Sequence, residues 1–178
     1  MSNNSFIIPE CYVDSCLIEV LIVADRNHVN HQKGNGTVAK EMRETFIDDF
    51  CVGIIDEDRK NLDYLKEFEV FKEKDSLKLW KHKTKDQFII QIRPVIEEWI
   101  LKICNDNNIH LGDFDLPVES KQLKKVSKSI SSKTDPRFIN LFKKMIKQSC
   151  EPAIQLRNWL LYLKNNKYQV DINELKNV

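Results

Sequence analysis

Residues 50–61 read FCVGIIDEDRKN, a short apolar run rich in β-branched residues that ends abruptly in charged ones. This profile is typical of a central strand whose C-terminal end opens into a loop. Functional residues favour that edge of an open α/β sheet. The stretch therefore predicts an α/β fold, and it singles out Asp56 and Asp58, the two aspartates at the end of the strand.

The segments on either side predict a Rossmann-like sheet with flanking helices. We expect strands at residues 6–13, 50–56 and 87–92, a hairpin or strand pair at 68–83, and helices at 37–49 (with Thr37 as N-cap), 61–68, 94–108, 119–131, 136–148 and 150–166. Residues 16–24 form either a helix buried on nearly all sides or a second buried strand. The chain divides at about residue 112 into a sheet-bearing core, 1–112, and a basic helical C-terminal extension, 113–178, within one compact unit.

Length and composition favour a single folded domain. Of the 178 residues, 42% are hydrophobic and 31% are charged, which suffices for a core without disulfide or metal staples. The five cysteines are odd in number and scattered, as in reduced proteins. The first residues lack a basic leader followed by an apolar core, and no apolar stretch is long enough to span a bilayer. We therefore expect a cytoplasmic protein that does not engage a membrane.

Charge is unevenly distributed along the chain. Residues 1–120 carry 15 basic and 23 acidic side chains, whereas residues 121–149 carry nine basic ones and a single acid, Asp135. A basic segment beside an acidic body is compatible with contact to a phosphate backbone, and the alternative is a solvated helix face.

Four carboxylates follow or flank the expected strands. Asp14 comes after the first strand, Asp56 and Asp58 come at the end of the strand at 50–56, and Glu97 lies at the start of the helix at 94–108. Because the C-terminal ends of neighbouring parallel strands lie side by side, these groups can converge, and their oxygens are ligands that suit Mg²⁺. The alternatives are a solvated turn for the two aspartates and a contact with the helix dipole for Glu97.

A fifth carboxylate, Glu19, lies among the apolar residues CLIEVLIV at 16–23. An unpaired carboxylate is costly to bury in such surroundings. Glu19 therefore either faces a polar cleft or pairs with a basic residue.

Three segments, VDSCLIEVLI, FCVGIIDEDR and QIRPVIEEWIL, together resemble the Toprim-like nuclease domains that accompany ABC-type ATPases in bacterial anti-phage systems, such as the OLD-type and abortive-infection families. The resemblance covers about residues 6–105. By position, Asp14 corresponds to the family's first glutamate, Glu19 to its helical acid, Asp56 and Asp58 to its DxD, and Glu97 to the glutamate that opens a later helix.

The chain departs from the family pattern at two positions. Asp14 is one methylene shorter than the family's glutamate, and Ser15 replaces its usual glycine. These departures are compatible with two alternatives. Either Glu19 is the acting group, or the domain binds metal without cutting.

The resemblance implies a Toprim-type endonuclease that hydrolyses phosphodiester bonds of DNA or RNA with one or two Mg²⁺ or Mn²⁺ ions. Asp56, Asp58 and Glu97 would hold metal, and Asp14 or Glu19 would ligate it or act as acid or base. Contacts to nucleic acid are expected from side chains at the cleft and in the basic segment, namely His31, Lys33, Arg59, Lys60, Lys124, Lys125 and Lys128. The implied partner is a separate ABC-type ATPase, since the chain has no GxxxxGK[ST] motif, and a homo-oligomer is compatible with the sequence.

Two other functions are compatible with the same residues. Aspartate-nucleophile phosphatases also carry a DxD after a buried strand, but they need a small or hydroxyl residue two places past the second aspartate, where this chain has Lys60. The other alternative is a non-catalytic, Toprim-shaped module that binds an ATPase partner or nucleic acid, with its carboxylates serving structure or sensing.

Overall fold

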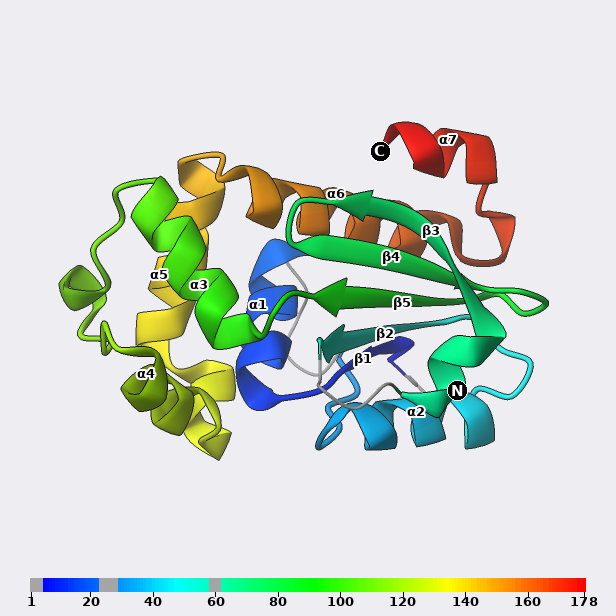
Figure 1. The fold of residues 1–178 in the computed structure, drawn as a ribbon, viewed down its shortest axis with the longest axis horizontal. Coiled ribbons are helices and arrows are strands. Elements are labelled where there is room, and N and C mark those ends of the chain that lie inside the picture. The colour runs from blue at the N-terminus through cyan, green and yellow to red at the C-terminus, as the bar shows by residue number, and fades with distance from the viewer. Residues whose placement is uncertain (1–4, 23–28, 58–61) are drawn as a thin grey trace.

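A five-stranded mixed sheet and seven α-helices make up the part of the chain that the computed structural model describes, residues 5–22, 29–57 and 62–178 (Figure 1). The strands are β1 (Ile7–Pro9), β2 (Cys51–Asp56), β3 (Phe68–Lys74), β4 (Leu77–His82) and β5 (Gln87–Ile92). Their order is β1-β2-β5-β4-β3, with β1, β2 and β5 parallel and β4 antiparallel to both β5 and β3. The C-terminal ends of β1, β2 and β5 therefore lie side by side at one edge.

The helices are α1 (Tyr12–Leu21), α2 (Asn35–Glu44), α3 (Ile96–Asp106), α4 (Ser120–Ser127), α5 (Pro136–Lys147), α6 (Glu151–Asn166) and α7 (Ile172–Asn177), and short 3₁₀ turns are η1 (Asp63–Glu67), η2 (Leu111–Phe114), η3 (Ile130–Thr134) and η4 (Lys167–Gln169). The two alternatives for residues 16–24 are settled in favour of a helix as far as Leu21. The predicted hairpin is confirmed as β3 and β4. Within the described ranges, no helix is long and apolar enough to cross a membrane.

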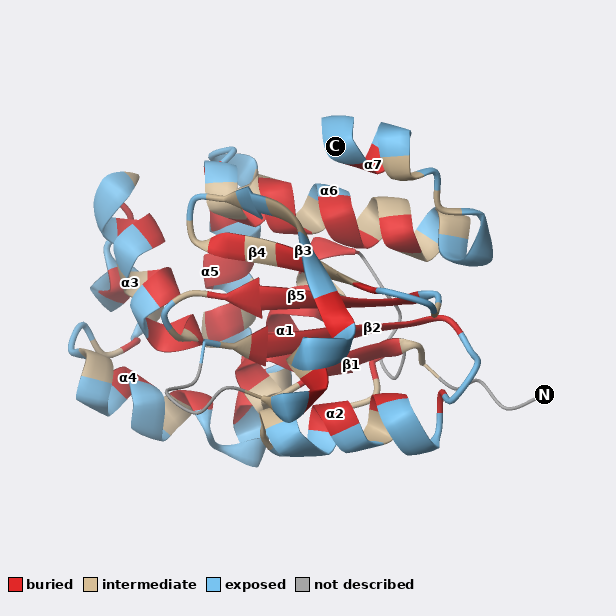
Figure 2. Cartoon of the chain, turned by 45° about the vertical axis from the view of Figure 1, so that its right-hand side comes forward, coloured by how far each residue is buried: buried red, intermediate tan, exposed pale blue. Residues whose placement is uncertain are grey.

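Helices cover the two faces of the sheet unequally. Because successive strand residues point to opposite faces, Ile54 and Ile90 enter the larger core with α1, α3, α5 and α6, whereas Ile55 and Ile89 pack with α2 and η1. The helices after residue 112 contribute buried residues to the larger core, with α4 packed on α3 and α5 on α1, and Figure 2 shows the buried residues along these helices. The C-terminal segment therefore shares its core with the sheet.

The first strand is shorter than predicted, because a capping box starts α1 early. The sequence predicts a strand at 6–13, but β1 ends at Pro9 and α1 begins at Tyr12. Cys11 Sγ accepts a hydrogen bond from Asp14 N (3.4 Å), and Asp14 Oδ2 accepts one from Cys11 N (3.1 Å). This reciprocal pair places Asp14 in the first turn of the helix rather than at the end of a strand.

The start of α2 also differs from the prediction. Thr37 is not the N-cap, since its hydroxyl donates back to the carbonyls of Lys33 (2.6 Å) and Gly34 (2.7 Å). The N-cap is Gly34, whose φ of 88° lies in the left-handed region that favours glycine. The glycine therefore lets α2 begin two residues earlier, at Asn35.

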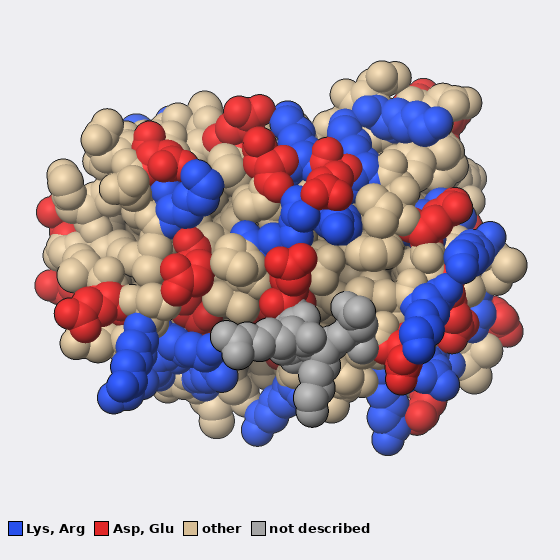
Figure 3. Space-filling model, viewed as in Figure 1, with Lys and Arg blue, Asp and Glu red and all other residues tan. Residues whose placement is uncertain are grey.

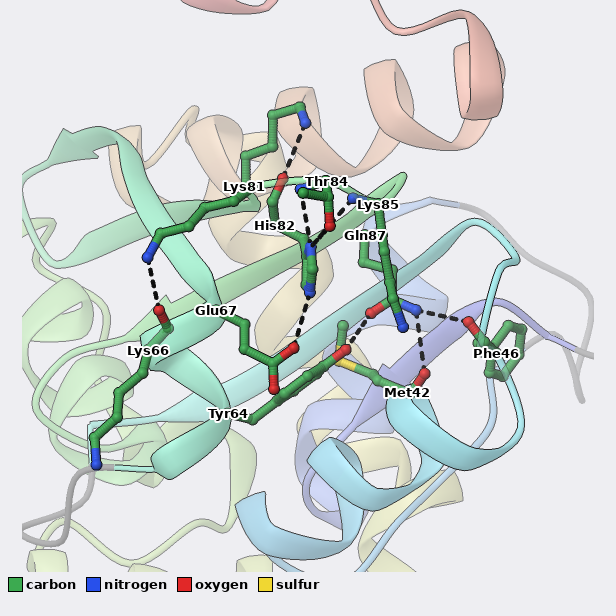
Figure 4. A network of polar contacts seen from close by, with 11 residues as sticks. Met42, Phe46, Tyr64, Lys66, Glu67, Lys81, His82, Thr84, Lys85 and Gln87 are labelled. Atoms are coloured by element: carbon green, nitrogen blue, oxygen red, sulfur yellow. Dashed lines mark hydrogen bonds and ion pairs between the residues drawn. The ribbon is translucent and has the colours of Figure 1, made fainter.

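A polar network closes the end of the sheet opposite the C-terminal edge (Figure 4). Gln87 accepts a hydrogen bond from Tyr64 OH (2.6 Å) and donates to the carbonyls of Met42 (3.1 Å) and Phe46 (2.6 Å). The Nδ1 atom of His82 accepts from two backbone amides, so its Nε2 carries the proton and donates to Glu67 (3.3 Å). The hydrogen bonds of Gln87 join α2 and η1 to the start of β5. We therefore assign these polar side chains a structural role.

The close approach of α2 to β2 is tested by Gly53→Ala. An added Cβ would lie 2.8 Å from Met42 Sδ and 3.1 Å from Val38 Cγ1, closer than packed side chains allow. We expect the free energy of unfolding in urea to fall by about 1–3 kcal/mol. The control is Gly112→Ala, whose added Cβ meets nothing within 4 Å, with an expected change below about 0.5 kcal/mol. Equal stabilities for the two variants would contradict this packing.

Candidate functional site

Three carboxyl groups converge where the three parallel strands end. Asp56 is the last residue of β2, Asp14 lies in the first turn of α1 after β1, and Glu97 lies in the first turn of α3 after β5. Asp14 is only 1% exposed and Glu97 only 3%. Burial and the negative charges of Asp14 and Glu97 raise the pKa of Asp56, and burial together with Glu97 raises that of Asp14. Asp14 and Asp56 therefore lie within electrostatic range of each other and of Glu97.

Glu10 is a fourth carboxylate of this group, and the sequence analysis missed it. It directly follows β1, and its Oε2 atom accepts a hydrogen bond from Asp56 N (2.9 Å). Its charge further raises the pKa of both Asp14 and Asp56. The available signal was its position immediately after a strand, the same position that drew attention to Asp56.

Each of the three carboxyl groups is held by one neutral donor. Asp14 accepts from the backbone of Cys11 (3.1 Å), Asp56 Oδ1 from the backbone of Ile96 (3.0 Å), and Glu97 Oε1 from the hydroxyl of Ser127 (2.5 Å). Asp14 Oδ1 is buried, and no residue that the structure describes forms a hydrogen bond with it. A buried carboxylate oxygen without a partner is costly, and a cation at this position would offset the cost.

The donor set fits a hard divalent cation in kind. All its atoms are carboxylate oxygens, which Mg²⁺ and Mn²⁺ prefer. Within residues 5–22, 29–57 and 62–178, however, no three Cys, His, Asp or Glu side chains are close enough together to chelate an ion directly. Asp58, the second aspartate of the predicted pair, lies outside the described residues. Water molecules could complete the coordination, as is usual for Mg²⁺.

Glu19 lies outside this group. It is five residues beyond Asp14, which amounts to about 140° of rotation around an α-helix. Its Oε1 atom lies 3.6 Å from Lys133 Nζ, and only 11% of its side chain is exposed. Of the two alternatives that the sequence left open, the structure shows the ion pair.

His31 also occupies a different position from the one expected. Its ring stacks on Tyr12 with centroids 3.9 Å apart, and its Nδ1 lies 3.3 Å from the hydroxyl of Ser15. Its Nε2 is buried. Burial lowers the pKa of His31, and Lys133 and Lys33 lower it further. The ring packs against Tyr12 and Ser15 of α1, and its lowered pKa disfavours the charged form that would attract phosphate.

Exposed lysines flank the carboxylates on one side. Lys124, Lys125 and Lys128 are exposed on or directly after α4, and Figure 3 shows basic side chains gathered over this helix. The bond from Ser127 to Glu97 fixes α4 beside the carboxyl group. Lys33 is exposed next to the N-terminus of α2, and the other two predicted contacts, Arg59 and Lys60, lie outside the described residues.

A cavity of about 320 Å³ adjoins the carboxylates on the α2 face of the sheet. Asp56 belongs to its wall, so the cavity and the carboxylate group share one residue. No protein-family model, curated protein or solved structure matches this chain. Inference of function therefore depends on the carboxylates, the lysines and this cavity.

The carboxylate group predicts how stability changes with pH. A carboxyl group whose pKa is higher in the folded than in the unfolded chain binds more protons when folded, so it stabilises the fold at low pH and loses this effect as pH rises through the folded pKa. The shifts of Asp14 and Asp56 are both upward. We therefore expect the wild type to lose stability between about pH 5 and about pH 8 in the absence of divalent metal.

The measurement is urea unfolding at both pH values, with EDTA present. In the double variant Asp14→Asn and Asp56→Asn, we expect the loss of unfolding free energy to be smaller by at least about 1 kcal/mol. The matched control is Asp113→Asn, which alters an exposed carboxyl group and should leave the pH dependence as in the wild type. Identical pH dependence in all three proteins would contradict the buried group.

Proposed function

We propose that this chain is a metal-dependent nuclease with a Toprim-like fold, which hydrolyses phosphodiester bonds of DNA or RNA. The observation that carries the proposal is the convergence of Asp14, Asp56 and Glu97 at the ends of three adjacent parallel strands. These are three of the positions that the resemblance to Toprim-like nucleases identifies. The unpartnered, buried Asp14 Oδ1 supports a cation among them.

In this proposal Asp14, Asp56 and Glu97 hold the metal, and Asp58 joins them as the resemblance implies. When bound, Mg²⁺ or Mn²⁺ supplies Lewis acidity toward the phosphodiester and its attacking water. The backbone amides of Cys11 and Ile96 and the hydroxyl of Ser127 orient the carboxylates, since each donates to one of them. These donors fix the orientation of the three carboxyl groups before a metal binds.

The basic surface supports a polyanionic substrate. Lys124, Lys125 and Lys128 are exposed beside the helix that binds Glu97, and Lys33 is exposed near the start of α2. Lysines at this spacing can follow a phosphate backbone without reading its sequence. Lys33 and the α4 lysines therefore orient a strand toward the carboxylates in this proposal. The resemblance also supports a separate ABC-type ATPase as partner, with the nuclease acting as effector of anti-phage defence.

A non-catalytic module that binds metal or a partner is the second candidate function. The observation that favours it is the absence, among the residues that the structure describes, of three side chains close enough to chelate an ion directly. This candidate predicts metal-dependent stabilisation without cleavage.

The proposal is tested by cleavage of plasmid DNA and total RNA by the purified chain, alone and with a co-purified ATPase, in Mg²⁺ and Mn²⁺. We expect cleavage to fall at least about 100-fold in the double variant Asp14→Asn and Asp56→Asn, because two proposed metal ligands are neutralised. Glu19→Gln is the matched control, an acid of the same helix that lies outside the group. We expect its activity to stay within about threefold of the wild type.

One outcome would contradict the proposed active group, and another would contradict the nuclease itself. If Glu19→Gln abolished cleavage while the double variant cut normally, the active group would be elsewhere on α1. If the wild type cut nothing in any condition while Mn²⁺ raised its melting temperature, and the double variant lost that increase, the non-catalytic metal-binding module would replace the nuclease.

A further inference from the structure

The cavity beside Asp56 is lined by aromatic, amide and lysine side chains that have no role in the proposed metal site. Its volume of about 320 Å³ falls within the range of small-molecule sites. It lies on the face of the sheet that α2 and η1 only partly cover. Its walls combine an aromatic ring, two amides, two lysines and the two carboxyl groups of Asp56 and Glu57. Asp56 is the residue through which this cavity meets the carboxylates.

Trp80 provides an aromatic wall whose orientation is fixed. Its Nε1 donates to Gln91 Oε1 (3.2 Å), which ties β4 to β5 across the sheet. The ring is half-buried, whereas Trp99 and Trp159 are 1% and 0% exposed. Trp80 is therefore the most exposed of the three tryptophans, and a fixed ring loses little entropy when a planar group packs on it.

Gln91 supplies hydrogen-bond donors to the same cavity. It is 7% exposed, and its oxygen is occupied by Trp80. Among the described residues, its Nε2 has no hydrogen-bond partner, although this atom carries two donors. This nitrogen is not among the buried atoms that lack a partner, so its donors remain accessible to a ligand whose edge carries an acceptor.

Positive charge lies at the other side of the cavity. Lys78 lies 5.4 Å above the Trp80 ring and 3.5 Å from Glu73. Lys66 lies on η1, where its exposed Nζ pairs with Asp63 (2.7 Å). Asn35, the first residue of α2, also lines the cavity, and the Gly34 cap brings no side chain to that helix end. Backbone N–H groups at a helix N-terminus attract phosphate, so an anion is favoured there.

We propose that this cavity is a nucleotide subsite, in which a base packs against Trp80 and hydrogen-bonds to Gln91 while its phosphate faces Lys66, Lys78 and the start of α2. The inference deepens the proposed nuclease, because Asp56 then lies between the bound base and the metal group. Two sources share this chemistry, a free nucleotide and an unstacked nucleotide within a single strand. In the second case, the phosphodiester next to the bound base meets the carboxylates.

Binding is measured by Trp80 fluorescence in EDTA, with excitation on the red edge of tryptophan absorption, where nucleotides do not absorb. The probes are UMP, CMP, AMP and GMP, a short single-stranded oligonucleotide, and a blunt duplex of the same sequence. Trp80 is the most exposed of the three tryptophans, and an emission change that is absent in Trp80→Phe is assigned to Trp80. EDTA separates this binding from cleavage.

Gln91→Leu is the diagnostic variant, since leucine keeps the volume of the wall and removes the donors. We expect its affinity for the probe that binds the wild type to fall about tenfold. Gln148→Leu, which alters an exposed amide at the end of α5, is the matched control and should bind as the wild type does. If Gln91→Leu unfolds, Lys78→Met takes its place with the same expectation, because it removes the cation above the ring.

The outcomes separate the sources and the two proposals. A response to mononucleotides assigns a free-nucleotide site, and a response to the single strand alone assigns an unstacked base of a strand. No emission change with any probe, or an unchanged affinity in Gln91→Leu or Lys78→Met, overturns the subsite. Cleavage without a Trp80 response would leave the nuclease standing and remove the subsite, whereas a Trp80 response without cleavage would do the reverse.

Discussion

Repulsion among buried carboxylates is the constraint on which the C-terminal edge of this sheet depends. Asp14, Asp56 and Glu97 lie at the ends of adjacent strands in a buried region, where the effective dielectric is low and like charges are costly. Within the described ranges, none of the three forms an ion pair with a lysine or arginine. Their hydrogen bonds come from neutral donors, which orient carboxylates without cancelling their charge. The group therefore needs either bound protons or a cation, and this need connects its fold to the proposed chemistry.

The central strands and the convergence of their carboxylates could be predicted because both follow from local pattern. The apolar run before Asp56 and the apolar run before Pro94 each have the length and β-branched content of a buried strand. Once these strands are parallel neighbours, Asp56 and Glu97 must end up near each other. The position of the site thus follows mainly from which strands pair in parallel.

The features that sequence reasoning missed depend on contacts made only after folding. Cysteine is not among the preferred N-cap residues, so nothing marked Cys11 as the start of α1. Glu19 pairs with Lys133, which is 114 positions further along the chain. Lys133 belongs to the basic segment, and its direction differs from that of Lys124, which is exposed. Charge counting along the sequence cannot separate a lysine that faces inward from one that faces solvent.

The mixed order of the sheet explains why a cavity lies next to the carboxylates. In an all-parallel sheet, helices cover both faces and the strands are apolar throughout. Here the β3–β4 hairpin replaces further parallel strands, and its residues alternate, with Leu77 and Leu79 in the larger core and Lys78 and Trp80 on the other face. The α2 helix packs on β1 and β2 and leaves that polar face accessible. The same departure from a parallel sheet thus places the aromatic and basic wall of β4 two strands away from Asp56 on β2, with Gln91 of β5 between them, which is the arrangement on which the proposed nucleotide subsite depends.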